Sequence, residues 1–342
     1  MVSLKFNLDL PASSHNVLLC GCGGGCDIYT GLPLYKSLVE SKKNVFCANI
    51  TFSDVDKLSK IATQVQELVF QVQYNDKVKI GEKYPDNYLP EWWLSKYFTT
   101  HKYANSFVYA IFSEGVIPLT KAFEHILTTH DIDTIIVVDG GIDSMMQGDE
   151  EGIGSFLQDI ATLLTVSQLE IPTKLLITNA WGMEGHISHN QFFENVSNLT
   201  KTQDFYGCFF FTATSPEGKF YLEVLKDCFP ENSTINIGII DAMLGCSWQE
   251  RSKWLEKRLE SEKVEYENME KLTLQNWFGC PLSGIYWFFN LEGVAKRLVY
   301  RDKIINSSEL YDIVQGVHHY RYNQGLVDDD GQYQGTRKSE FF

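Results

Sequence analysis

The sequence predicts a doubly wound α/β fold, in which a mostly parallel sheet carries helices on both faces. Five continuously apolar runs predict strands, at residues 16–21, 43–52, 133–141, 173–182 and 206–215. Continuous rather than alternating hydrophobicity is typical of strands that are buried on both faces of a parallel sheet. Segments with apolar residues at helical spacing separate several of these runs, and such an alternation is typical of a doubly wound sheet.

The remaining elements follow from the same spacing rules. Helices are predicted over residues 54–72, 117–132, 155–169 and 307–322. The first of these begins with acidic residues, which favour a helix N-terminus. Residues 285–300 predict a late strand followed by a turn or an edge strand.

The chain shows no internal repeat and no low-complexity linker, so a single domain spanning residues 1–342 is the simplest organisation. An aromatic-rich insertion near 74–104 interrupts the regular pattern, and we expect it to cover a sheet edge or the active-site side. Glu and Lys residues at helical spacing predict a charged helical segment near 247–272, either solvated or at an oligomer contact. The tail from Asp328 is expected to be mobile.

Composition limits the classes of partner. With 342 residues, of which 44% are hydrophobic, the chain can bury a substantial core. Its net charge of -15 disfavours nucleic acid, whose phosphates an acidic surface repels. Neither a membrane-spanning run nor a signal peptide is recognisable, so we expect a cytoplasmic protein with eight reduced cysteines.

The first candidate site is the segment GCGGGCD, residues 21–27, directly after the first predicted strand. Gly23, Gly24 and Gly25 would let the backbone approach a phosphate-bearing or nucleotide-like ligand, and free N–H groups would face the anion. The segment fits G-x-G-x-x-G only loosely, because Cys26 holds the last position, and it lacks the G-K-[ST] of a Walker loop. A tight turn without a ligand is the alternative.

Asp27 closes this loop and complicates a simple phosphate site. A carboxylate repels phosphate unless a cation lies between them, so Asp27 suggests magnesium, a ligand hydroxyl or a helix cap. The nearby Cys20, Cys22 and Cys26 do not match a common zinc spacing, and no base for a cysteine nucleophile is identifiable. Packing is the simpler role for these thiols.

A second loop, residues 137–159, concentrates acids and glycines directly after a buried strand. Ligands bind at the carboxyl edge of such a sheet, so we predict a site there. The predicted catalytic residues are Asp139, Asp143 and Asp149. The predicted metal ligands are Asp27, Asp139 and Asp143, and Gly140, Gly141 and Ser144 would contact the ligand. A solvated acidic loop is the alternative.

Two further strand ends carry polar residues. At the end of the run 173–182 and just after it, Asn179, Glu184, His186 and His189 are polar groups at the sheet edge. For the two histidines, a local capping or surface role is favoured over metal binding. The run 43–52 ends near Asn49, where a classical dinucleotide fold has an acid that holds the ribose. The missing acid weakens a standard NAD interpretation.

Together, GCGGGCD, DGGIDSMMQGDEEGIG and GMEGHIS resemble the motifs of the domain-of-unknown-function family 1152, from about residue 16 to about residue 300. The resemblance implies a Rossmann-like α/β fold but no particular activity. The cysteines of the first loop depart from the more purely glycine version of that motif.

The sequence thus favours an enzyme that binds a phosphorylated small molecule, with metal-assisted hydrolysis or group transfer by clustered Asp residues. One alternative is an NAD(P)-dependent oxidoreductase, and another is a non-catalytic ligand-binding or scaffold protein. The sequence is also compatible with a homo-oligomer.

Overall fold

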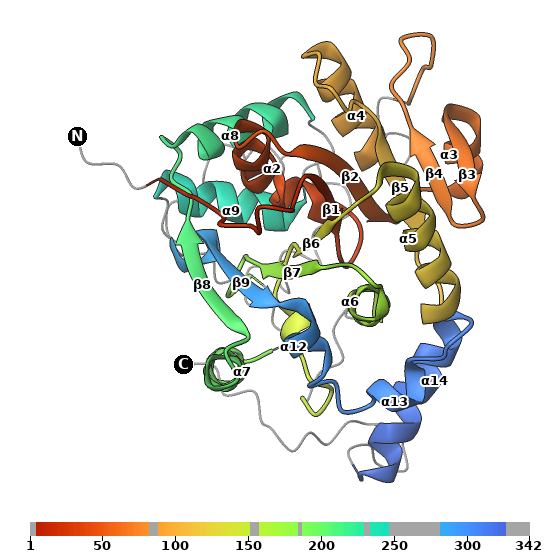
Figure 1. Ribbon diagram of the computed structural model, residues 1–342, viewed down its shortest axis with the longest axis vertical. Helices are drawn as coiled ribbons and strands as arrows, with labels where there is room; N and C mark the ends of the chain where they lie inside the picture. The colour runs from red at the N-terminus through yellow and green to blue at the C-terminus, as the bar shows by residue number, and fades with distance from the viewer. Residues whose placement is uncertain are drawn as a thin grey trace, which may run out of the picture.

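The computed structural model describes residues 5–81, 88–150, 157–183, 187–228, 233–245 and 281–325. These residues contain a nine-stranded sheet in the order β3-β4-β5-β2-β1-β6-β7-β9-β8 (Figure 1). Its parallel centre consists of β5 (Val108–Phe112), β2 (Asn44–Thr51), β1 (Asn16–Gly21), β6 (Thr134–Asp139) and β7 (Thr173–Thr178). The predicted α/β class with a mostly parallel sheet is therefore confirmed.

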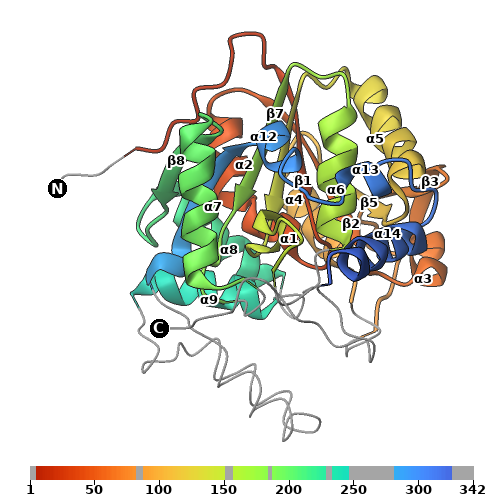
Figure 2. The same ribbon diagram turned by 90° about the horizontal axis from the view of Figure 1, so that it is seen from below.

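Helices cover both faces of the sheet, so the fold has three layers. Figure 1 shows α2, α8 and α9 on one side and α6, α7 and α12 on the other, and Figure 2 shows α5, α6 and α7 in front of the sheet. The first layer comprises α1 (Asp27–Thr30), α2 (Leu32–Glu40), α4 (Pro90–Thr100), α8 (Pro216–Asp227) and α9 (Thr234–Leu244). The second comprises α5 (Val116–His130), α6 (Leu157–Gln168), α7 (His189–Lys201), α12 (Leu291–Ala295), α13 (Arg301–Ile304) and α14 (Leu310–Asn323).

The alternation of side chains along β1 explains why its sequence is apolar throughout. Val17 and Leu19 lie in the core beneath α2, whereas Leu18 and Cys20 lie in the core beneath α6. Neighbouring residues of a strand point to opposite faces, and here both faces are buried. The predicted helices at 117–132, 155–169 and 307–322 are present as α5, α6 and α14.

The prediction of one helix over residues 54–72 is wrong beyond its first two turns. Helix α3 (Val55–Ile61) is capped by Asp54, whose carboxylate accepts from the N–H of Lys57 at 3.0 Å. The chain then forms the antiparallel strands β3 (Ala62–Gln66) and β4 (Val69–Val72). Thr, Val and Phe suit a half-buried strand, and pairing of β4 with β5 outweighs the helical spacing.

The edge strand β8 (Phe205–Phe210) and its neighbour β9 (Ile285–Asn290) also differ from expectation. Strand β8 is half exposed and pairs antiparallel with β9, rather than lying buried in the parallel centre. Strand β9 is followed by α12 and α13, not by an edge strand. The insertion near 74–104 contains α4, which packs on β4 and β5. The charged segment 247–272 and the tail from Asp328 lie outside the described residues.

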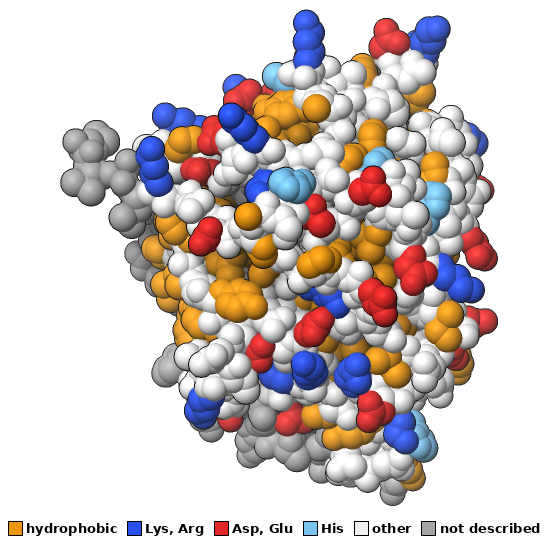
Figure 3. Space-filling view, viewed as in Figure 1, with side chains coloured by type: hydrophobic (Ala, Val, Ile, Leu, Met, Phe, Trp, Pro, Cys, Tyr) orange, Lys and Arg blue, Asp and Glu red, His pale blue; other side chains and the backbone are white. Residues whose placement is uncertain are grey.

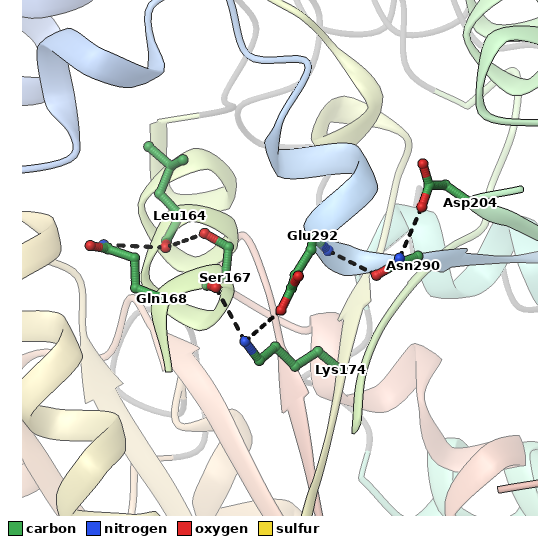
Figure 4. A network of polar contacts seen from close by, with 7 residues as sticks. All are labelled: Leu164, Ser167, Gln168, Lys174, Asp204, Asn290 and Glu292. Atoms are coloured by element: carbon green, nitrogen blue, oxygen red, sulfur yellow. Dashed lines mark hydrogen bonds and ion pairs between the residues drawn. The ribbon is translucent and has the colours of Figure 1, made fainter. Parts of the chain in front are cut away.

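A network of hydrogen bonds and an ion pair connects α12 to the amino end of β7 (Figure 4). The ammonium of Lys174 donates to a carboxylate oxygen of Glu292 at 2.8 Å and to the carbonyl of Ser167 at 3.2 Å. Asn290 donates in turn to Asp204 at 2.9 Å. This network joins α6, β7, β9 and α12 at the end of β7 that lies opposite the candidate site.

The molecular surface does not gather its charge into one patch on the face viewed in Figure 3, where acidic and basic side chains are interspersed. Within the described ranges, no helix is long and apolar enough to cross a membrane.

Candidate functional site

The site is built from three carboxylates at the carboxyl edge of the sheet. Asp27 begins α1 after β1, Asp139 ends β6, and Asp159 lies in the first turn of α6. One oxygen of each lies within 4.8 Å of the others. We call these residues the three-acid group.

Asp27 is held by the glycine loop that it closes. Its carboxylate accepts from the N–H of Gly23 at 2.7 Å and from the N–H groups of Gly24 and Gly140. The φ of +109° at Gly24 belongs to the left-handed region that favours glycine. A side chain at Gly140 would collide with Asp27. The loop therefore holds a carboxylate of its own chain where a phosphate loop would hold a ligand.

Asp139 and Asp159 are each 3% exposed, but their hydrogen bonding differs. Asp139 accepts from the backbone N–H of Ser144 at 3.0 Å and from its hydroxyl at 2.5 Å. Asp159 packs against Gly23, where a Cβ would lie 2.5 and 2.6 Å from its two oxygens. Its Oδ1 is buried and has no hydrogen-bond partner among the residues that the structure describes.

Burial makes the charged form of each of these acids unfavourable. It raises the pKa of Asp27 to about 7, against the opposing effect of the backbone N–H donors. It raises the pKa of Asp139 and of Asp159 well above the ordinary value, and the neighbouring acids add to this effect. In the described part of the chain, the groups that act most strongly on these pKa values include no basic side chain. Among the described residues, the strongest charges acting on the three-acid group are therefore those of other acids.

The third member of the three-acid group is Asp159, which was not among the predicted site residues. The predicted Asp143 and Asp149 are not part of the group. Asp143 begins the short helix η1 (Asp143–Met145), and its charge raises the pKa of all three acids without its joining the group. Asp149 is outside the group, in a segment held by Arg321 through the carbonyl of Glu150 at 2.9 Å. Asp159 lies in a predicted helix, where a single acid is the usual sign of a solvent-facing position.

A buried amide fixes the glycine loop from the side of β2. Asn49 donates to the carbonyl of Gly25 at 2.8 Å and accepts from the N–H of Ile28 at 3.3 Å. It also donates to Glu91 of α4 at 2.7 Å, and Glu91 accepts from the hydroxyl of Ser53 at 3.2 Å. Burial raises the pKa of Glu91. Glu91 was not among the predicted site residues: the insertion near 74–104 was expected to cover a sheet edge or the active-site side, but its spacing does not indicate which of its residues contacts Asn49.

The loop cysteines do not converge on one point. Cys20 and Cys22 lie in the core beneath α6, whereas Cys26 lies in the core beneath α2. Burial raises the pKa of the Cys20 and Cys22 thiols, which keeps them protonated. The opposite placement of Cys26 excludes a common zinc site for the three, and packing explains all of them.

The polar residues after β7 are only partly described. The N–H of Asn179 donates to the carbonyl of Gly141 at 3.1 Å, which places Asn179 next to the second loop. Its buried side-chain amide has no hydrogen-bond partner within the described residues. His189 begins α7 and packs on Trp181, with ring centroids 4.2 Å apart, and burial lowers its pKa. Glu184 and His186 lie outside the described residues.

Comparison with known proteins gives one match. The model of a family described as "Protein of unknown function (DUF1152)" matches residues 62–248, more than half of the chain. No curated protein and no solved structure matches it.

Proposed function

The chain belongs to the family of proteins of unknown function DUF1152, and from its site we propose a metal-dependent enzyme that acts on a phosphate-bearing small molecule by hydrolysis or group transfer. The observation that carries the proposal is the three-acid group at the carboxyl edge of the sheet, where open α/β sheets bind their ligands.

The donor set suits a hard divalent cation such as magnesium. Three carboxylate oxygens within 4.8 Å of one another can converge on one ion, and oxygen ligands are those that magnesium and calcium prefer. The unsatisfied Oδ1 of Asp159 is a second, independent sign, because a buried carboxylate oxygen without a donor is costly. A cation would neutralise the group and give this oxygen a partner.

The glycine loop already donates hydrogen bonds to Asp27, and this determines how a phosphate would bind. The N–H groups of Gly23 and Gly24 already donate to Asp27, so they are not free to cradle an anion. A phosphate would instead meet the protein through the cation, which supplies charge neutralisation and activation of a bound oxygen. The predicted contacts of Gly23, Gly24, Gly25, Gly140 and Gly141 with the ligand then serve mainly to shape the wall of the site.

The remaining acid has a separate role in this proposal. Asp143 lies close enough for its charge to act on the three-acid group, yet it is not one of the group. We assign it the acceptance of the proton from the attacking water or hydroxyl. Ser144 holds Asp139 by two hydrogen bonds and thereby orients a metal ligand.

Calorimetry tests the metal site. Magnesium, and then pyrophosphate in its presence, would be titrated into the wild type, Asp139→Asn and Asp159→Asn, with Glu292→Gln at the far end of β7 as the matched control. Loss of magnesium binding in both site variants but not in the control is expected. Wild-type binding in both site variants would contradict the proposal.

Turnover tests the enzymatic part. The wild type and Asp143→Asn would be assayed for phosphate release from a panel of phosphorylated small molecules with magnesium. We expect Asp143→Asn to bind magnesium but to lose at least about a hundredfold in rate, the usual contribution of a general base. Binding without turnover of any compound by the wild type would favour the non-catalytic alternative.

A further inference from the structure

An exposed aromatic ring lies beside the three-acid group. Phe52 directly follows β2, and 54% of its surface is exposed, although the rings of the two main cores are covered. Leaving so much apolar surface in water forgoes stabilisation that burial would give. A single exposed ring is ordinary, so its position decides whether it has a role.

Its position is set by the glycine loop. A Cβ at Gly24 would lie 2.5 to 3.0 Å from three carbons of the Phe52 ring, so the ring lies directly against this backbone. A Cβ at the preceding Gly23 would lie 2.5 Å from the carboxylate of Asp159. Consecutive Cα atoms are about 3.8 Å apart. The ring and the three-acid group therefore flank the same short stretch of backbone.

A second aromatic side chain reaches the same loop. The hydroxyl of Tyr88 would lie 3.2 Å from a Cβ at Gly25, and a ring carbon of Phe52 would lie 3.7 Å from it. The loop thus has carboxylates at one end and aromatic groups at the other. A matching ligand carries negative charge at one end, bridged by a cation, and a flat apolar surface at the other.

Resting on the proposed function, we infer that the ligand is a nucleotide, whose base stacks on Phe52 while its phosphates meet the cation at the three-acid group. Every nucleobase has a flat face, and stacking on an aromatic side chain stabilises it by an amount that depends little on its identity. A sugar phosphate or inorganic phosphate has no flat surface to cover the ring. Pyrophosphate, which has the phosphates of ADP but no base, is therefore the competing ligand in the test.

The test compares ADP with pyrophosphate, both titrated calorimetrically with magnesium into the wild type, Phe52→Ala and Phe52→Trp. Tyr206→Ala is the matched control, because Tyr206 is 58% exposed on the edge strand β8. We expect Phe52→Ala to weaken ADP at least about fivefold, the lower end of the usual contribution of stacking. Pyrophosphate affinity should stay within twofold, and Phe52→Trp and Tyr206→Ala should bind ADP like the wild type.

The outcomes separate the two proposals. If pyrophosphate binds with magnesium but Phe52→Ala leaves ADP affinity unchanged, the nucleotide inference is wrong and the proposed function stands. If Phe52→Ala weakens both ligands equally, the ring supports the loop and the inference is again wrong. If neither magnesium nor pyrophosphate binds to the wild type, the proposed function fails. Circular dichroism verifies that each variant is folded, and Phe52→Leu replaces Phe52→Ala if that variant is not.

Discussion

Asp27 accepts hydrogen bonds from the glycine loop that precedes it, and this arrangement changes the role of the loop. A glycine-rich turn after a first strand is usually expected to bind phosphate directly. Here the backbone N–H of Gly23 donates to Asp27 at 2.7 Å, and those of Gly24 and Gly140 donate to it as well. The loop therefore positions an acid beside Asp139 and Asp159, and under the proposed function an anion would bind there only together with a cation.

The substitution Asp159→Asn should stabilise the protein in the absence of divalent cations. It removes a buried carboxylate whose Oδ1 has no described donor and which adjoins two other acids. Sites that bind ligands commonly sacrifice stability in this way. We expect the Tm to rise, by about 1–2 °C per kcal/mol of stabilisation at this chain length, as measured by calorimetry in EDTA.

The same variant should lose the rise in Tm that magnesium gives to the wild type, because a ligand stabilises only the state that binds it. Asp143→Asn serves as the control and should keep most of that rise. A lower Tm for Asp159→Asn in EDTA would show that its carboxylate is stabilised in a way that the three-acid group does not explain.

Part of the site could be predicted from single residues. Asp27 closes the loop that follows the apolar strand β1, and Asp139 ends the apolar strand β6, so their positions at the carboxyl edge could be foreseen. Asp159 could not, because an acid in a helix is normally solvent-facing and only the packing of α6 on the glycine loop buries it. Asp143 and Asp149 belong to the same acid-rich loop as Asp139, but their carboxylates lie outside the three-acid group. Residue spacing alone does not show which acids of the loop come together.

The buried amide of Asn49 links strand β2 to helix α4 and to the glycine loop, so the loop depends on elements far from it in sequence. Asn49 contacts Gly25, Ile28 and Glu91 through its side chain. Asn49→Ala would remove these hydrogen bonds and leave Glu91 buried with fewer donors. At about 1 kcal/mol each, the loss of unfolding free energy should be about 2–3 kcal/mol, measured by urea denaturation.

Asn44→Ala is a matched control for this experiment. Asn44 begins the same strand but is exposed, and its side chain bonds Asn16 and Asn105 at the surface. Its substitution should change stability by less than about 0.5 kcal/mol. Equal effects of the two substitutions would mean that the Asn49 network does not stabilise the loop.

Lys174 and Glu292 provide a pH-dependent link between β7 and α12. The hydrogen bond from Lys174 lowers the pKa of Glu292 below its ordinary value of 4.5. Glu292 therefore releases its proton more readily when folded. Its contribution to stability is complete above pH 4.5 and is lost as the pH falls through the lowered pKa.

Lys174→Met should remove this pH dependence while keeping the apolar stem. The Glu292 side chain is 43% exposed, so solvent screens the pair and the loss should be about 0.5–1 kcal/mol at neutral pH. Urea denaturation from pH 3 to pH 7 measures it. A variant whose stability follows the wild-type pH curve at a constant offset would contradict this role of the pair.

The sequence predicts the buried central strands of the sheet better than it predicts the strands at one edge of the sheet. Continuous apolar runs correctly predict β1, β2, β6 and β7, which are buried on both faces, whereas the run at 206–215 corresponds to the half-exposed edge strand β8. The apolar spacing of the β3–β4 hairpin fits a helix as well as a strand, and the contact with β5 that decides between them is distant in sequence. Strand β5 itself was not predicted, because it lies between an irregular insertion and α5.

The sheet as a whole extends well beyond the segment that matches the family model. Residues 62–248 include β6 and β7 but exclude β1, β2 and β9, which lie on either side of them. A protein consisting of residues 62–248 alone would leave β5, β6 and β7 each without one of its two neighbouring strands, and β8 without its described partner β9. Open edges of apolar strands lead to aggregation.

We therefore expect this segment to aggregate and to lack a cooperative unfolding transition, in contrast to the full chain. Size-exclusion chromatography and near-ultraviolet circular dichroism measure the two properties. A monomeric segment with a sharp transition would show that β1, β2 and β9 are dispensable for folding, against the topology.

Strand β9 lies between β7 and β8 in the sheet but is synthesised last, so this part of the sheet can form only late in synthesis. Strand β8 ends at Phe210, but its described partner β9 begins only at Ile285. At the usual 5–20 residues per second, the ribosome takes roughly 4 to 15 s to make the intervening chain. For that interval β7 and β8 lack the described partner strand β9, and we expect a nascent chain with such unpaired strands to bind chaperones.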